Sequence, residues 1–462
     1  MFFSLSGKER IILIIACLAI FMDGLDGSIA MIALPTITAD YHVGVDISTW
    51  VLVSYLFVIC VFILPMGKII ERQGVQKIFI AGFALFAVTS LVCACAPSIW
   101  VLIAARFAQG VGACMLAAAT PALVAIRLPF SICGYAFGMI GAACAIAFAL
   151  GPVIGGMLVE FLSWHWIFLI NIPIGVLAAL VSWIYIDADC ELVPKTRLDY
   201  EGAGLIAVTA SLLLLLVNGW SIYALWISAC LTLCLLILGY ITFKWEKSRK
   251  DPIIPQALIS DTRVMAVLLS LLTGLTVFTG FIFILPFYME IVLRMSPALS
   301  GMYLFIPAFL AAIISPFAGK MMDKYGGRII TCIGAVSAVL ACLVFFGAGQ
   351  IQLFFIFLLG LLLFGIAMGM FQGPASGRVI TVSPKEWYAL ASASVSMSVY
   401  FGASLGTALF SGILSYYYDI TASGHNSSFL AGWTTVCIIA LLLSLITLYG
   451  EWRFLDSSSD VE

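Results

Sequence analysis

Charge is what this sequence has least of. Only 10% of its 462 residues are Asp, Glu, Lys or Arg, whereas 63% are hydrophobic and the mean hydropathy is +1.18. Soluble domains carry about 25% charged residues, and no soluble fold could bury this much apolar surface. The formal net charge of -2 also excludes a general role in nucleic-acid binding, which needs basic residues. The scarcity of charge therefore predicts a membrane protein.

Motifs for ATP hydrolysis and for metal binding are missing as well. No GxxxxGK[ST] sequence occurs, so a P-loop is excluded. The three histidines, His42, His165 and His425, fall between the predicted helices, and no HExxH is present. The 13 cysteines form no repeated CxxC and no Cys/His cluster, so we expect them to pack as small apolar side chains. We expect no cofactor, no metal site and no enzymatic activity.

Long apolar runs are what the sequence has instead. A helix needs about 20 apolar residues to cross a bilayer. Fourteen runs qualify, at roughly 11–33, 50–70, 77–95, 99–127, 134–158, 166–186, 199–217, 222–244, 264–289, 299–320, 329–348, 354–382, 389–414 and 430–450. The expected fold class is an all-α polytopic membrane protein.

The basic residues predict the orientation in the membrane. If the N-terminus is cytoplasmic, all of the 21 basic residues except Arg106 and Arg294 fall at or near the cytoplasmic side. This bias indicates that both termini are cytoplasmic and that the number of helices is even. We expect a multi-pass protein of the plasma membrane, monomeric in the lipid bilayer.

One turn sequence occurs twice, which predicts two related halves. The segment GKIIERQG at 67–74 returns 252 positions later as GKMMDKYG at 319–326. Chance similarity of two short turns is the alternative explanation. Parallel halves are typical of transporters that bind substrate between the halves near the middle of the membrane. We predict six-helix bundles at 1–190 and 251–452, an inserted helix pair at 191–250, and a cytoplasmic tail at 453–462.

Two carboxylates stand inside the first apolar run. Asp23 and Asp26 lie about one helical turn apart, at a depth where a charge is costly unless it has a partner, faces a cavity or binds a proton. Arg106 in the fourth run lies at the same depth as Asp26, about 12 Å below the outer end at ~1.5 Å per residue. We predict that Asp26 pairs with Arg106, because each charge would otherwise be stranded in a low dielectric.

Two interpretations of these acids stay open. In the first, Asp26 exchanges a proton with the bulk and couples transport to a proton gradient, while Asp23 shares the proton or binds a cation. In the second, Asp26 and Arg106 form a structural ion pair and Asp23 only faces a water-filled vestibule.

The second half lacks a counterpart of this pair, since the offset carries Asp26 to Phe278 and Arg106 to Leu358. It therefore contributes mainly apolar and weakly polar surface. Aromatic surface accepts ligands of many shapes, which suits a broad range of substrates. The candidates for the cavity wall are Asp23, Tyr55, Gln109, Phe148, Phe278, Phe281, Phe371, Gln372 and Tyr400.

Two glycine patterns predict close contacts between helices. GPVIGG at 151–156 removes side chains from part of the fifth run, and Gly365, Gly369, Gly373 and Gly377 recur every four residues in the twelfth. Small residues at such spacings let helix backbones approach each other in lipid. The spacing alone does not separate static packing from a sliding contact.

With these segments identified, the sequence resembles the major facilitator superfamily, specifically its fourteen-helix drug:proton antiporter branch. LDGSIAMIALP (25–35) is similar to the first-helix signature, whose acid falls on Asp26, and RFAQGVG (106–112) resembles the fourth-helix motif, which implies a role for Arg106 in proton transfer. SWHWIFLINIPIG (163–175) is similar to the entry of the sixth helix. The antiporter motif of the fifth helix would comprise Gly151, Pro152, Gly155 and Gly156.

The resemblance also implies a cytoplasmic gate. GKIIERQGVQK (67–77) is similar to the superfamily's loop between helices 2 and 3. Anchoring at the positive side of the membrane explains Arg72 equally well, but not Glu71. The gate residues would be Gly67, Glu71, Arg72, Gly74, Arg127 and Asp323.

The sequence departs from the branch at several positions. Glu71 stands where aspartate is usual and Ser28 where threonine is usual. Residues 389–414 contain no acid, which argues against export of divalent cations, because only Asp23 and Asp26 could neutralise a cation in the cavity.

The predicted function is export of amphipathic or lipophilic organic compounds, monocationic or neutral, in exchange for protons by alternating access. Such activity would confer drug resistance. An exporter of one endogenous metabolite would use the same acids but accept few ligands. A non-transporting membrane scaffold or receptor would tolerate neutralisation of Asp26.

Overall fold

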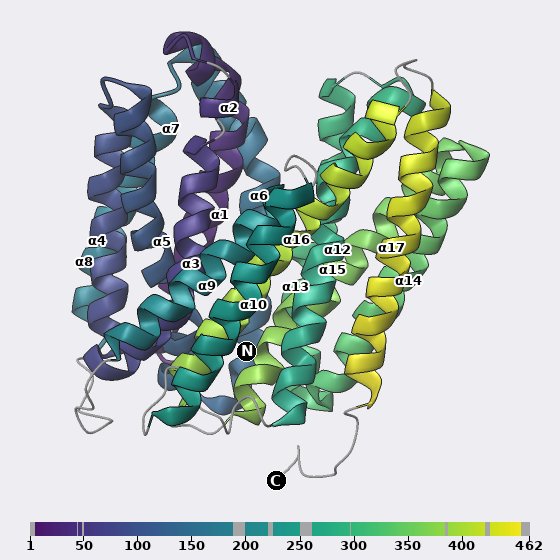
Figure 1. The fold of residues 1–462 in the computed structure, drawn as a ribbon. Coiled ribbons are helices and arrows are strands. Elements are labelled where there is room, and N and C mark those ends of the chain that lie inside the picture. The colour runs from purple at the N-terminus through teal and green to yellow at the C-terminus, as the bar shows by residue number, and fades with distance from the viewer. Residues whose placement is uncertain are drawn as a thin grey trace.

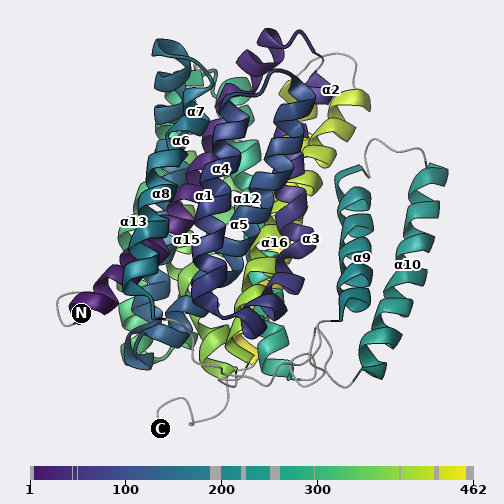
Figure 2. The same ribbon diagram turned by 90° about the vertical axis from the view of Figure 1, so that its left-hand side faces the viewer.

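The chain is a bundle of long helices (Figures 1 and 2). The computed structural model describes residues 5–43, 45–48, 50–187, 199–219, 225–249, 261–295, 297–383, 387–420 and 426–453. In order, the elements are α1 (Gly7–Asp40), α2 (Val45–Ser48), α3 (Trp50–Gln73), α4 (Val75–Ala94), α5 (Ile99–Arg127), the 3₁₀-helix η2 (Phe130–Ile132), α6 (Cys133–Phe161), α7 (Trp166–Leu169), α8 (Asn171–Tyr185), α9 (Tyr200–Gly219), α10 (Leu225–Ser248), α12 (Thr262–Phe287), the π-helix η3 (Tyr288–Val292), α13 (Pro297–Tyr325), α14 (Gly327–Ile351), α15 (Phe354–Val382), α16 (Tyr388–Ile420) and α17 (Asn426–Arg453).

The helices have the length and composition that a bilayer requires. Within the described ranges, 13 are long and apolar enough to cross a membrane. The shorter apolar stretch Glu201–Leu216 lies in α9, at the place of the seventh predicted span. The all-α polytopic fold class is therefore confirmed.

Local sequence signals explain where several helices begin. Ser6 starts α1 with a capping box, in which its hydroxyl accepts from the Glu9 N–H and the Glu9 carboxylate accepts from the Ser6 N–H. Ser98 caps α5 through the Val101 N–H, and the Asp261 carboxylate accepts from the Arg263 N–H at the start of α12. These bonds satisfy amides that the first turn of a helix leaves free.

The two copies of the repeated turn have the same backbone conformation. Gly74 has φ 89° and Gly326 has φ 85°, and each immediately precedes the next long helix. A Cβ disfavours positive φ, which explains why each copy of the turn has glycine at this position.

The long helices other than α9 and α10 form two groups, α1 and α3–α8 in the N-terminal half and α12–α17 in the C-terminal half. The halves meet mainly where α13 and α15 pack on α6, and where α16 packs on α3 and α5. We call the end at which Lys8, Arg72, Arg127 and Lys324 lie the basic end, and the opposite end the far end. In Figure 1 the two groups of ribbons stand apart at the top, the far end.

The inserted pair lies beside the bundles (Figure 2). α9 packs on α3 and α16, one helix from each half, and α10 packs on α9. A small apolar cluster fills the contact of α9 with both halves, comprising Cys60, Val61, Ala210, Leu214 and Phe401. No residue of α10 from 226 to 248 is buried in the protein, so this helix presents its sides to lipid.

Helices continue past the ends of the predicted apolar runs. α1 continues beyond the predicted end at 33 as far as Asp40, because Ala33 and Ile37 remain on its buried face. α14 likewise runs past the predicted end at 348 to Ile351, and it ends on Gln352 in the left-handed region at φ 54°.

Candidate functional site

A buried ion pair in the N-terminal half joins α1 to α5. Nη1 of Arg106 lies 2.5 Å from Oδ2 of Asp26, and the two residues are 0% and 2% exposed. The predicted pairing of Asp26 with Arg106 is therefore confirmed as a contact. Both side chains are sealed from solvent, so each charge depends on the other and on nearby dipoles.

Neutral side chains complete the coordination of the Asp26 carboxylate. Oδ1 of Asp26 accepts from Nδ2 of Asn171 at 2.7 Å and from Nε2 of Gln109 at 3.2 Å. Gln109 also accepts from Nη1 of Arg106 at 2.7 Å and donates to the Ser90 hydroxyl at 2.8 Å. We call Ser90, Gln109 and Asn171, together with the ion pair, the Asp26 network; it connects α1, α4, α5 and α8.

Arg106 is held from two further directions. Its Nε donates to the Val51 carbonyl of α3 at 2.9 Å. Its guanidinium carbon lies 4.2 Å from the ring centroid of Tyr55 and 5.7 Å from that of Phe168, and both rings present negative π-electron density to the cation. These contacts hold the guanidinium from two sides in its ion pair with Asp26.

Asp23 lies one turn from Asp26 but in different surroundings. One carboxylate oxygen accepts from the Tyr55 hydroxyl of α3 and the other from the Tyr400 hydroxyl of α16. Asp23 is half-buried, whereas Asp26 is fully buried. Because α3 belongs to the N-terminal half and α16 to the C-terminal half, this carboxylate connects the two halves.

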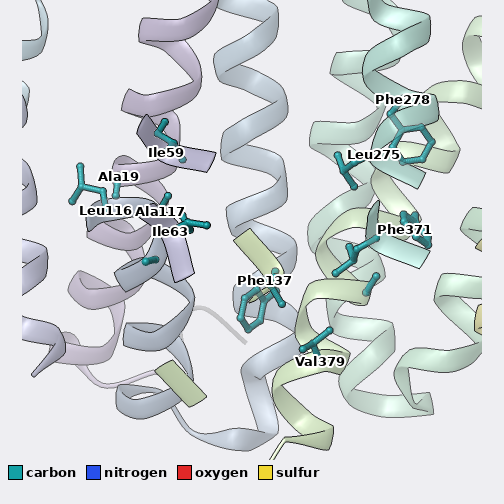
Figure 3. Close-up of a cluster of buried hydrophobic side chains, with 14 of the residues drawn as sticks. Ala19, Ile59, Ile63, Leu116, Ala117, Phe137, Leu275, Phe278, Phe371 and Val379 are labelled. Atoms are coloured by element: carbon teal, nitrogen blue, oxygen red, sulfur yellow. The ribbon is translucent and has the colours of Figure 1, made fainter. Parts of the chain in front are cut away.

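Three aromatic residues predicted for the cavity wall lie elsewhere: Phe278, Phe281 and Phe371. Phe278 and Phe281 of α12 are 1% and 0% exposed, inside an aromatic core with Phe345, Phe364, Phe371, Phe410 and Trp433. Figure 3 shows Phe278 and Phe371 within the C-terminal half, away from the meeting point of α6 and α15 at Phe137 and Val379. Close packing within one bundle leaves these rings no surface for a ligand, so we exclude Phe278, Phe281 and Phe371 from the site.

The other predicted wall residues divide into two groups. Gln109 is 0% exposed and belongs to the Asp26 network rather than to a cavity. Phe148 is half exposed, and its ring lies next to Gly24. Gly24 is located between Asp23 and Asp26 in the sequence. Gln372 and Tyr400 are partly exposed. Phe148, Gln372 and Tyr400 therefore remain candidates beside Asp23. Tyr55 is 2% exposed and remains a candidate only because its hydroxyl contacts the Asp23 carboxylate.

Glycines of the predicted antiporter motif bring α6 against the back of α1. A Cβ at Gly151 would collide with the Ser28 side chain, and one at Gly155 would lie 3.3 Å from Cγ2 of Ile29. Gly156 has no atom within 4 Å of that position, so it makes no such contact. α6 is a continuous helix through Pro152. The motif thus packs on the turn of α1 that directly follows Asp26.

The predicted gate residues lie at the basic end in three separate groups. Glu71 lies 3.3 Å from Nζ of Lys68 on its own helix, and Arg72 is exposed at the end of α3, the helix that also carries Gly67 and is followed by Gly74. Nη2 of Arg127 donates to the Asp187 carbonyl at 2.9 Å. The neighbouring Lys8 ammonium lowers the pKa of the exposed Asp187 carboxylate by hydrogen bonding and by charge.

Asp323 forms a contact between the halves. Its two carboxylate oxygens accept from the backbone N–H groups of Gly134, at 2.7 Å, and Tyr135, at 2.8 Å, in the first turn of α6. A carboxylate at this position is favoured by the free amides and by the helix dipole. Asp323 therefore binds the basic end of α13 to that of α6.

Sequence reasoning missed Asn171. It lies inside the segment 163–175 that was noted for its resemblance to a helix entry, and it is the sole amide side chain of that segment. A lone asparagine in an apolar run is a signal of a buried polar contact, because such a group needs a partner. What it contacts became visible only when α8 was placed beside α1.

Two similar helical halves, with one carboxylate sealed in an ion pair and another held between the halves, define the class of protein as a polytopic membrane transporter. The sequence profile of the Major Facilitator Superfamily matches residues 16–407, and the chain belongs to this family. It is a membrane transporter and not an enzyme.

Known proteins of similar sequence and structure include transporters for different compounds. The riboflavin transporter RibZ of Clostridioides difficile (strain 630) is 28% identical over 451 residues, 95% of this chain and 97% of that protein. The multidrug resistance protein Stp of Mycobacterium tuberculosis (strain ATCC 25618 / H37Rv) is 28% identical over 428 residues, 90% and 78% of the two chains. The human organic anion transporter MFSD10 (TETRAN) superposes with a TM-score of 0.71 at 16% identity, covering 96% of this chain and 100% of that one. The proton:xylose symporter XylE gives 0.69 at 14% identity, covering 98% and 97%.

Proposed function

We propose that this transporter exports amphipathic or lipophilic organic compounds, monocationic or neutral, in exchange for protons by alternating access. The observation that carries the proposal is the contrast between two acids on one helix. Asp26 is sealed in an ion pair within one half, and Asp23 is half-buried between the halves. One acid suits a proton and the other suits a ligand. The basic end would face the cytoplasm, across the plasma membrane.

Asp26 is the proposed proton site. Protonation removes the charge that holds the Arg106 guanidinium, so the ion pair weakens when the proton binds. The Gln109 and Asn171 amides still provide hydrogen-bond partners for the neutral carboxyl. In the proposed cycle the proton reaches Asp26 from outside and leaves to the cytoplasm, with Arg106 favouring its release.

Asp23 is the proposed site for the charged group of a cationic substrate, or for a shared proton. A substrate ammonium that approached its carboxylate would replace the hydroxyl bonds from Tyr55 and Tyr400. The Tyr400 ring could then contact the cation through its face, whereas the Tyr55 ring already faces the Arg106 guanidinium. Since Tyr400 belongs to the C-terminal half, occupation of Asp23 would change how the halves are held together.

The basic end is the proposed cytoplasmic gate. The contact of Asp323 with the first turn of α6 favours closure at this end, and separation of α6 from α13 would break it. Glu71, Arg72 and Arg127 are proposed to act on the same side.

A dedicated exporter of one metabolite is the second candidate. The similarity to a protein named as a riboflavin transporter, over nearly the full length of both chains, favours it. The two candidates differ in ligand range rather than in the role of Asp26. A scaffold or receptor without transport would have no need for the Asp26–Arg106 pair.

Efflux from proteoliposomes tests the proposal. Purified protein is reconstituted, a pH gradient is imposed, and the movement of a fluorescent lipophilic cation is measured for the parent, Asp26→Asn and Asp23→Asn. We expect gradient-driven transport in the parent and a loss of about 100-fold or more in Asp26→Asn, the scale of removing an essential proton carrier. Asp23→Asn should impair cationic substrates more than neutral ones.

Glu160→Gln provides the matched control, since it also removes one carboxylate charge but from the exposed end of α6. It should transport like the parent. Gradient-driven transport that survives in Asp26→Asn would contradict the proposed proton site. If the parent moves no lipophilic cation, a screen of metabolites including riboflavin decides for or against the second candidate.

A further inference from the structure

A second buried ion pair lies in the C-terminal half, away from the Asp26 network. Arg378 of α15 pairs with Oε2 of Glu451 on α17. The Thr331 hydroxyl of α14 donates to the same oxygen at 2.7 Å and accepts from Nη1 of Arg378 at 3.1 Å. Glu451 is 0% and Arg378 9% exposed. Three helices are therefore joined at one point near the basic end.

Stability of the bundle alone does not explain this pair. Apolar residues of similar volume usually hold helices at least as well as a buried ion pair does, because both charges must be desolvated. An ion pair differs from apolar packing by fixing a side chain in one direction. The residues that contact the Arg378 side chain therefore indicate what the ion pair positions.

The aliphatic part of Arg378 lies over the repeated turn. A Cβ on Gly327 would be 2.7 Å from Cδ of Arg378 and 3.3 Å from Cγ of Met322. Gly327 begins α14 directly after Gly326, the residue with positive φ. The Arg378 stem thus closes on the turn between α13 and α14, while its guanidinium is held by Glu451.

Met322 connects the α13–α14 turn to α15 and to the first turn of α6. Its Cε would lie 2.9 Å from a Cβ on Gly377 of α15, and its Cγ would lie 3.0 Å from one on Gly134 of α6. Met322 is 6% exposed, so it is enclosed by both halves. The next residue in the chain is Asp323, which accepts the hydrogen bonds from the first turn of α6.

We propose that Arg378 and Glu451 are positioning residues of the gate, which fix the α13–α14 turn and thereby hold Asp323 against the first turn of α6. Thr331 orients both charges. When the pair is broken, the turn and Met322 gain freedom and the contact between the halves loosens, although no residue of that contact has changed. The inference rests on the proposed function in one respect, since the gate's part in transport belongs to that proposal.

Hydrogen–deuterium exchange of the intact protein in detergent or nanodiscs tests the inference. The reporter is the peptide that contains the Gly134 and Tyr135 amides, which Asp323 protects. We expect Asp323→Asn to exchange about tenfold faster there, because charge-assisted hydrogen bonds are lost. We expect Glu451→Gln to exchange at least about threefold faster at the same amides. The double variant should equal Asp323→Asn, since both changes act on one contact.

Two further variants keep the test decisive. Thr331→Val removes the shared hydroxyl without stranding a charge, and it should give a smaller increase at the same amides if Glu451→Gln does not fold. Glu160→Gln, on the same helix as the reporter, should leave those amides unchanged.

The possible results separate the two proposals. Faster exchange in α14, α15 and α17 with unchanged Gly134 and Tyr135 amides would overturn the inference, because the pair would then only stabilise its own bundle. Unchanged amides in Asp323→Asn itself would instead refute the gate contact. Transport assays of the same variants then show whether the gate acts in the cycle, independently of whether the pair positions Asp323.

Discussion

Asp23 and Asp26 lie three residues apart, yet the structure gives them opposite surroundings. The carboxylate of Asp26 meets a guanidinium and two amides and is sealed, whereas that of Asp23 meets two phenol hydroxyls and is partly open. Burial with a fixed countercharge suits a site that binds one small ion, the proton. Partial exposure between two halves suits a site that binds a larger cation. A single turn of helix thus places the two proposed sites side by side.

Asn171 gives the first prediction at this scale. Asn171→Leu keeps the volume but removes a donor to a buried carboxylate, so we expect a loss of about 1.5–3 kcal/mol in the free energy of unfolding and slower proton-driven efflux. Thermal unfolding and the efflux assay measure the two effects. Ser182→Ala on the same helix is the control, because the buried Ser182 hydroxyl has no hydrogen-bond partner within the described residues. Equal behaviour of the two variants would contradict the role of Asn171.

Among the polar residues, the sequence predicted a specific contact only where a charge had to find a partner. Equal depth in two apolar helices was enough to predict the Asp26–Arg106 contact, which is confirmed; its role in transport stays a prediction. Arg378 was assigned only to the positive side of the membrane, because Glu451 lies just beyond the last apolar run, 430–450, and no depth argument connected the two. Phe278 and Phe281 were misplaced because hydrophobic runs in membrane helices do not reveal which face meets the protein interior and which meets a cavity.

At the scale of helices, small residues determine how closely α1 and α6 approach. Gly24 faces Ala147, Gly151 faces Ser28, and Gly155 faces Ile29, so the two helices are in close contact along more than two turns. This seam lies directly behind the acids. A shift of α6 would therefore move the helix that carries both of them.

A matched pair of glycines tests the seam. Gly151→Ala should cost about 1–3 kcal/mol and reduce efflux, since its Cβ collides with Ser28. Gly156→Ala, in the same helix, should be neutral because nothing lies within 4 Å of the added carbon. Adding Ser28→Gly to Gly151→Ala should restore part of the stability. Equal losses for Gly151→Ala and Gly156→Ala would show that α6 does not pack on α1 in this way.

Helix number and order were predictable because bilayer thickness fixes the length of every span, and the repeated turn was predictable from an exact offset in the sequence. The ends of the helices were less predictable. α1 extends to Asp40 and α14 to Ile351 because the ends depend on caps and on packing rather than on hydropathy. The packing of α9 on both halves was also beyond sequence reasoning, since an apolar helix in lipid carries little signal of its neighbours.

At the scale of the whole molecule, the contacts that join the halves lie at different depths. Asp23 meets Tyr400 within the membrane, and Asp323 meets the first turn of α6 at the basic end. A ligand at Asp23 would act on the first contact, and the Arg378–Glu451 pair would act on the second. In the proposed cycle, the first contact between the halves responds to substrate and the second closes one side. Exchange of proton for substrate requires that the two be coupled.

The fold by itself does not decide the direction of proton movement, since a proton:xylose symporter has a similar structure. Simultaneous recording of substrate efflux and internal pH in proteoliposomes tests this central claim most directly. With a substrate gradient and no initial pH gradient, we expect protons to move opposite to the substrate in the parent and neither flux in Asp26→Asn. Protons that move with the substrate, or substrate flux without any proton movement, would contradict the account.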